Sequence, residues 1–230
     1  MHITKEVELE TILNSMAGIL NNNPTRFTTD YEVAEFLRCS HNLFSSWKGK
    51  LDPVLAGTYS DDQFWLLYED FCRECENGSW SGMSRHKSEI EPYKSSLYAS
   101  IRNLLSAGID INRVVGIIHS VTKNSSPSKI TGLTPFSLTG ILFASDEDNF
   151  MILDNPVLEY FGFKDRDYEG ALSEYEGIID KSRYYSKKFN LSMWDINKAY
   201  AVLSNNRKLE VKKLCGNCRS LKTKNYEYPF

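Results

Sequence analysis

The chain has 230 residues, of which 41% are hydrophobic, 25% charged and 13% aromatic. This composition excludes intrinsic disorder, and a chain of this length can bury a core without the help of disulfides or a metal. The formal net charge of −3 excludes indiscriminate attraction to nucleic acid through bulk charge.

The apolar runs and the cysteines bear on where the protein works. The longest apolar runs, such as Val114–Ile118, are far too short to span a bilayer. The first ten residues lack the basic-then-apolar pattern of a secretion signal, and the five cysteines are an odd number. We therefore expect an intracellular, cytoplasmic protein that meets reducing conditions and has no membrane association.

Apolar residues recur at helical spacing along the first half of the chain. Thr29-Asp-Tyr-Glu32 and Ser60-Asp-Asp-Gln63 each have the pattern of a capping box, which opens a helix. Glu76-Asn-Gly78 is a helix stop, and a polar stretch follows it. The spacing predicts helices over 5–21, from 29 through 37, and over 60–76, 95–106 and 111–122.

The second half is also helical in pattern. Lys123–Lys129 is a clear loop, and Thr134-Pro135 starts a helix with proline in its first turn, where the missing N–H does no harm. We expect a short extended or 3₁₀ piece over 150–153, then helices over 156–161, 168–182 as one long helix, and 192–203. Since period-two alternation is never sustained, the chain is predicted to be all-α, with about ten helices and few or no strands.

Charge and polarity divide the chain into three parts. We expect an N-terminal helical layer over 1–90, a helical core over 91–205 and a basic tail over 206–230. The tail has two interpretations: it contacts DNA phosphates, or it is a solvated C-terminus. Its candidate phosphate-binding residues are Arg207, Lys208, Lys212 and Lys213.

Residues 130–154 carry a resemblance to a known family. Ile130-Thr-Gly-Leu-Thr134 opens a helix with small residues on one side, and Phe150-Met-Ile-Leu-Asp154 follows at the start of the next. This layout resembles the helix-hairpin-helix (HhH-GPD) superfamily of DNA glycosylases. Over about 110–205 it is similar to the archaeal 8-oxoguanine glycosylases and to the phage and bacterial α-glutamyl/putrescinyl thymine pyrophosphorylase group. The resemblance implies a glycosylase-like helical fold with a degenerate hairpin.

The resemblance also implies a reaction and a partner. Asp154 falls at the position of the catalytic aspartate, which stabilises the positive charge that builds on the sugar as an N-glycosidic bond breaks. The partner is duplex DNA with one base flipped into an aromatic pocket. The implied DNA contacts near the hairpin are Lys123, Lys129, Gly132 and Thr134, and the candidate pocket residues are Tyr184, Tyr185 and Trp194.

Two positions depart from the family pattern. Thr134 stands where the family usually has its second hairpin glycine, which lets backbone N–H groups approach a phosphate. Phe136 stands where bifunctional members have their nucleophilic lysine. The expected activity is therefore monofunctional: excision of a modified or damaged base, in DNA repair or phage defence, without lyase chemistry and without a cofactor.

Other interpretations stay open beside this one. Asp154, just before Asn155-Pro156, is also a standard helix N-cap, and tyrosines at helical spacing are often core residues. The scaffold would then serve a non-catalytic DNA- or protein-binding module. A third interpretation is a transferase that modifies a base on the same scaffold.

The cysteines form two CxxC pairs, Cys72–Cys75 and Cys215–Cys218. Four cysteines suffice for a structural zinc site. However, the first pair lies on the apolar face of a helix, where buried thiols need no metal, and the pairs are far apart in the chain. We therefore assign no metal site, and a zinc site formed by the four cysteines stays an open alternative.

Overall fold

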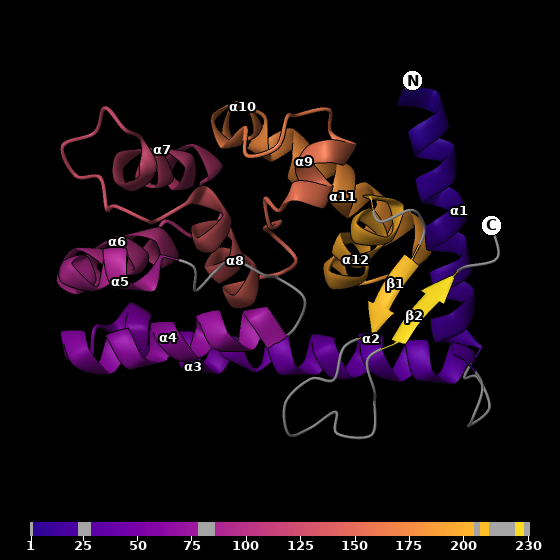
Figure 1. The fold of residues 1–230 in the computed structure, drawn as a ribbon, viewed down its shortest axis with the longest axis horizontal. Coiled ribbons are helices and arrows are strands. Elements are labelled where there is room, and N and C mark those ends of the chain that lie inside the picture. The colour runs from indigo at the N-terminus through magenta and orange to yellow at the C-terminus, as the bar shows by residue number, and fades with distance from the viewer. Residues whose placement is uncertain (1, 23–28, 78–85, 205–207, 212–223, 228–230) are drawn as a thin grey trace.

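The structure, a computed structural model, describes residues 2–22, 29–77, 86–204, 208–211 and 224–227. These residues are predominantly helical, which confirms the all-α expectation (Figure 1). The helices of the first half are α1 (His2–Asn21), α2 (Thr29–Ser45), α3 (Trp47–Ala56), α4 (Asp61–Asn77), α5 (Lys87–Ile90), the 3₁₀ helix η1 (Glu91–Tyr93), α6 (Lys94–Ser106) and α7 (Ile111–Thr122). Those of the second half are α8 (Pro135–Ser145), α9 (Asn155–Tyr160), α10 (Tyr168–Ser173), α11 (Tyr175–Phe189) and α12 (Met193–Ser204).

Local signals in the sequence account for several helix boundaries. The box at the start of α4 forms as expected: the Ser60 N–H donates to Gln63 Oε1 at 2.9 Å, and the Gln63 N–H donates to Ser60 Oγ at 3.3 Å. A second box starts α12, where Ser192 Oγ accepts from the Asp195 N–H at 3.1 Å and Asp195 Oδ2 accepts from the Ser192 N–H at 3.0 Å. Each box satisfies backbone donors that a helix start leaves unpaired.

Two helical features differ from the expectation, and two short strands fall within the few that were expected. Helix α3 was not predicted, although Trp47, Leu51 and Val54 form its buried stripe at helical spacing. The expected long helix over 168–182 is wrong: α10 ends before Glu174, whose backbone leaves helical geometry (φ −109°, ψ 14°), and α11 begins after it. The chain also has two short strands, β1 (Lys208–Val211) and β2 (Lys224–Glu227), which pair antiparallel.

The helices pack in two groups, and α1 from the first part of the chain lies against helices of the last part (Figure 1). Helix α1 packs against α11 and α12 near the C-terminal end of the chain, and α12 also packs against α9 and β1. Helices α3 and α4 pack against α6, and α8 contacts α2, α3, α6 and α7. Helix α8 lies at the centre, and all of its residues except Phe136 and Ser145 are buried.

The buried segment 150–153 connects this centre to Asp154. From one side, the Thr139 hydroxyl of α8 accepts a hydrogen bond from the Leu153 N–H at 3.1 Å. From the other, the Tyr175 hydroxyl of α11 donates to the Met151 carbonyl at 2.6 Å. Side chains from two helices therefore replace the sheet partners that this extended backbone lacks, and they place Asp154 at the start of α9. None of the helices in the described residues is long and apolar enough to cross a membrane.

We predict that Thr139→Val lowers the free energy of unfolding by about 1–3 kcal/mol, because the buried Leu153 N–H loses its acceptor while the side-chain volume stays the same. Urea denaturation measures the change. The control is Thr11→Val on α1, where the exposed hydroxyl bonds only to the Val7 carbonyl of its own helix. Equal effects of the two substitutions would contradict the assigned role of Thr139.

Candidate functional site

Asp154 is a buried carboxylate whose two oxygens have different partners. It caps α9, since Oδ1 accepts from the Val157 N–H at 3.1 Å. Its Oδ2 accepts from Asn197 Nδ2 of α12 at 3.3 Å. Only 8% of the residue is exposed, and burial raises its pKa from 3.8 to about 6. The interpretation of Asp154 as the N-cap of α9 is thus confirmed, and its second carboxylate oxygen contacts α12.

Three further residues surround this carboxylate. Asn197 (1% exposed) and Lys198 (3% exposed) follow one another on α12. The Lys198 ammonium lies 4.4 Å from the centre of the Trp194 ring, and its charge opposes the rise in the Asp154 pKa. Tyr168, at the start of α10, has its pKa raised to about 12 by burial and then by the Asp154 charge. We call Asp154, Tyr168, Asn197 and Lys198 the Asp154 site.

A buried aspartate is an expensive helix cap. Asparagine, serine or threonine would cap α9 about as well without placing a charge in the interior. The difference between a pKa of about 6 and the ordinary 3.8 corresponds to about 3 kcal/mol at neutral pH. Carboxylates whose pKa is raised by burial beside a specific charged partner are more frequent at functional sites than elsewhere. Capping alone therefore does not explain an aspartate at this position.

The hairpin before α8 needs glycine for a packing reason. Gly132 has a φ of +82°, and a Cβ there would lie 2.8 Å from the His86 Cβ and 3.1 Å from the Glu89 Cβ. The hairpin thus packs closely against α5, and Gly132 is required for both its backbone angle and this contact. Thr134 caps α8 by accepting from the Ser137 N–H at 3.4 Å.

The predicted basic contacts lie on several parts of the chain. Lys123 forms an ion pair with Glu169, and Lys129 donates to Asn124 Oδ1 within the same loop. Lys208 is in β1, and only its backbone is described. The predictions for Arg207, Lys212 and Lys213 lie outside the described residues.

The predicted base-pocket residues contact different partners. Tyr184, 51% exposed, and buried Tyr185 lie together on α11 with ring centres 5.4 Å apart, and the Tyr185 hydroxyl donates to Glu6 Oε1 of α1 at 3.0 Å. Trp194 is buried on α12, with its ring centre 5.0 Å from that of Phe44 on α2. Trp194 alone approaches the Asp154 site, through Lys198.

A cavity of about 430 Å³ lies beyond the other end of α9, between α1 and α11. Its lining combines aromatic and charged side chains, among them Lys5, Glu6, Tyr160, Phe161, Phe163 and Lys181. The Tyr160 and Tyr185 hydroxyls lie 2.8 Å apart, and Glu6 Oε1 accepts from both Tyr185 and Lys181. Asp154 does not line this cavity.

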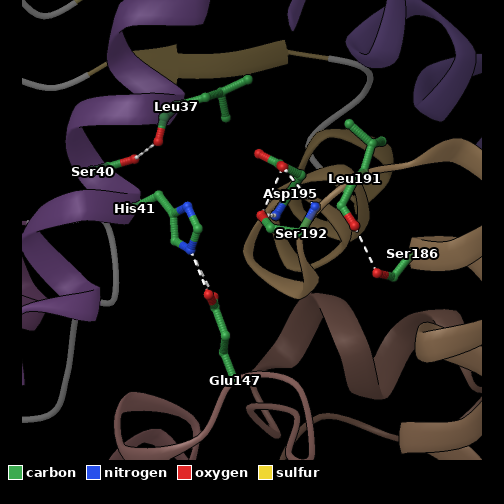
Figure 2. A network of polar contacts seen from close by, with 8 residues as sticks. All are labelled: Leu37, Ser40, His41, Glu147, Ser186, Leu191, Ser192 and Asp195. Carbon is green, nitrogen blue, oxygen red and sulfur yellow. Dashed lines mark hydrogen bonds and ion pairs between the residues drawn. The ribbon is translucent and has the colours of Figure 1, made fainter. Parts of the chain in front are cut away.

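A second buried acid, Asp195, lies near an ion pair between α2 and the loop before α9. Figure 2 shows His41 of α2 reaching Glu147, with His41 Nε2 2.6 Å from Glu147 Oε1, beside the Ser192–Asp195 cap of α12. The hydrogen bond to Glu147 is the main cause that raises the pKa of His41 above 6.5. The His41 ring also stacks on Trp194, with centres 6.2 Å apart. His41 therefore connects α2 both to the loop between α8 and α9, through Glu147, and to α12, through Trp194.

The described residues contain no group of three or more potential metal ligands among His, Cys, Asp and Glu. Cys72 and Cys75 on α4 are buried thiols, as expected for a helix face that packs into the core. Cys39 on α2 is disulfide-bonded, which departs from the reducing conditions that we expected. Cys215 and Cys218 lie outside the described residues, so the four-cysteine zinc site is not tested by the structure.

Reasoning from the sequence missed Asn197, Lys198 and Tyr168. The segment 193–200 carries a signal: Asp195, Asn197 and Lys198 interrupt the apolar pattern of α12 and are nevertheless buried. Buried polar residues in a helix normally have a specific partner. The pattern alone did not identify Asp154 as that partner, because the two positions are 43 residues apart.

We predict that the His41–Glu147 pair makes stability depend on pH. Because the folded pKa of His41 is raised, its contribution is fully present below pH 6.5 and is lost as the pH rises through the folded pKa. Glu147→Gln should therefore flatten the decline of the unfolding free energy above pH 6.5, measured by urea denaturation. The control is Glu89→Gln, which removes the exposed pair with His86 and should change the slope little. An unchanged slope in Glu147→Gln would refute the assignment.

We also predict that Asp154→Asn stabilises the protein at pH 8, by up to about 3 kcal/mol. Asparagine keeps the cap and removes the buried charge. Because the folded pKa of Asp154 is raised above 3.8, ionisation of this residue destabilises the wild-type protein as the pH rises from about 4 to 6. The stability gained by Asp154→Asn should therefore shrink as the pH falls over the same range. Asp110→Asn, at the exposed cap of α7, is the matched control and should have little effect. A loss of stability in Asp154→Asn at pH 8 would disprove the cost assigned to this carboxylate.

Comparison with known proteins adds no relative: no family model, no curated protein and no solved structure matches the chain.

Proposed function

We propose that the protein is a DNA glycosylase without lyase activity, which releases a modified or damaged base from duplex DNA. The observation that carries this proposal is the buried Asp154 carboxylate, which is kept at a cost although a neutral cap would serve. Asp154 ends a buried segment that follows a hairpin and a buried helix, and this order supports the role that the family resemblance implies for it.

The chemistry follows from the charge of Asp154. As the N-glycosidic bond breaks, positive charge develops on the sugar, and a carboxylate in a largely water-free site stabilises that charge more strongly than one in solvent. With a pKa of about 6, Asp154 is mostly ionised at neutral pH and can still accept a proton from water. Since Phe136 takes the place of the family's lysine, the proposed reaction stops at an abasic site.

One observation favours a second function. Gly132 is packed against His86 and Glu89, so the hairpin backbone at this glycine is covered by α5 rather than left open for a phosphate. A chain that lost the phosphate contact would bind DNA or protein through another surface without base release. This non-catalytic module is the alternative that the experiment must separate from the enzyme.

The test is base release from a panel of duplexes with oxidised purines and from phage genomic DNA with modified pyrimidines. We predict abasic sites, revealed as strand breaks only after mild alkali, and a rate about 10²–10⁴-fold lower for Asp154→Asn. Asp110→Asn serves as the control cap and should keep full activity.

Equal activity of wild type and Asp154→Asn would remove Asp154 from the reaction. DNA binding without release from any substrate would select the non-catalytic module. A base that gains mass while the glycosidic bond stays intact would select the transferase on the same scaffold.

A further inference from the structure

Asn197 has a buried acceptor that nothing in the described residues satisfies. Its Nδ2 donates to Asp154 Oδ2 at 3.3 Å and lies 4.0 Å from the Met151 sulfur. Its Oδ1 is buried and has no hydrogen-bond partner among the described residues. Buried carbonyl groups in folded proteins almost always accept from a protein group or from an ordered water. The position beside Oδ1 therefore calls for a donor.

Asp154 has spare capacity next to that position. A carboxylate accepts about four hydrogen bonds, and the Val157 N–H, the Asn197 amide and the backbone of Asp154 itself occupy three of these positions. In the Asn197 amide, Oδ1 is bonded to the same carbon as the Nδ2 that contacts Asp154. The unsatisfied Oδ1 of Asn197 and the unused acceptor position of the Asp154 carboxylate are therefore close together. A water has two O–H donors, and buried waters typically make two to four hydrogen bonds to such groups.

We propose that Asp154 and Asn197 together hold one water, which donates one O–H to the Asp154 carboxylate and the other to Asn197 Oδ1, and that Asn197 is the positioning residue for this water in base release. The inference rests on the proposed function and names the nucleophile and its second holder. With both hydrogens engaged, the lone pairs of the water oxygen are directed away from the two acceptors and are free to attack.

The reaction balances with these groups. The bond between the sugar C1′ and the base nitrogen breaks, and its electron pair leaves with the base. The water oxygen forms the new bond to C1′, and one water proton passes to the Asp154 carboxylate. The departing base takes a proton from solvent, and Asp154 returns its proton to solvent. Asn197 only orients the water and gains or loses no proton.

The test variant is Asn197→Leu, which keeps the side-chain size and removes both the donor to Asp154 and the unsatisfied acceptor. Removing both polar atoms together leaves no new unpaired group on residue 197, so the variant should fold. The control is Asn103→Leu on the exposed face of α6, away from the Asp154 site.

We expect three results. A crystal structure of the wild-type chain should show a water within about 3 Å of both an Asp154 carboxylate oxygen and Asn197 Oδ1, absent from Asn197→Leu. Base release by Asn197→Leu should fall about 10²-fold through loss of positioning. The pH–rate profile should shift upward, because the Asn197 hydrogen bond favours the ionised form of Asp154. This shift follows from the observed hydrogen bond alone, so the positioning role is tested by the loss of the water together with a lower rate at a pH where Asp154 is ionised in both proteins.

The outcomes separate the inference from the proposed function. A wild-type crystal structure with no water between the two residues overturns the inference, even if bases are released and even if the variant does not fold. Unchanged release and an unchanged pH profile in Asn197→Leu overturn it as well. A bound water in a protein that releases no base overturns the proposed function and leaves the water site in place.

Discussion

The burial of α8 is the constraint on which the other elements depend. A helix buried on nearly all sides must be covered by neighbours all round, and α2, α3, α6 and α7 provide that cover. Its interior position also places Thr139 where its hydroxyl can satisfy the backbone of the following buried segment. The location of Asp154 is thus a consequence of helix packing, set by one hydroxyl on α8 and by Tyr175 on α11.

Much of the helical framework was predictable from the sequence because its signals are local. Capping boxes, a glycine stop and a proline in a first turn act within four residues, and α4, α8 and α9 have boundaries close to those expected. The break at Glu174 was not predictable in this way, since apolar residues keep helical spacing across it. The packing of α1 against α12 likewise depends on contacts that no local pattern records.

The residues of the candidate site also differ in whether a local sequence signal identifies them. Asp154 was predictable because its signal is local: a hairpin, a helix and a short buried run end on it. Asn197, Lys198 and Tyr168 were not, because they come from α12 and α10 and meet Asp154 only in three dimensions. The aromatic pocket was predicted from residue type alone, and residue type does not tell which side of a helix faces which neighbour. Tyr184 is accordingly exposed on α11, whereas Trp194 is buried on α12 against Phe44 of α2.

The pairing of α1 with the end of the chain bears on synthesis at the ribosome. Glu10 of α1 bonds to Lys188 of α11, 178 residues later, and the buried face of α1 includes Leu9, Ile12, Leu13 and Met16. At about 5–20 residues per second, this apolar face emerges roughly 10–35 s before its final partners are made. A long-lived exposed helix of this kind is a natural binding surface for chaperones. A circular permutation that places α1 after its partners in the chain would remove this delay.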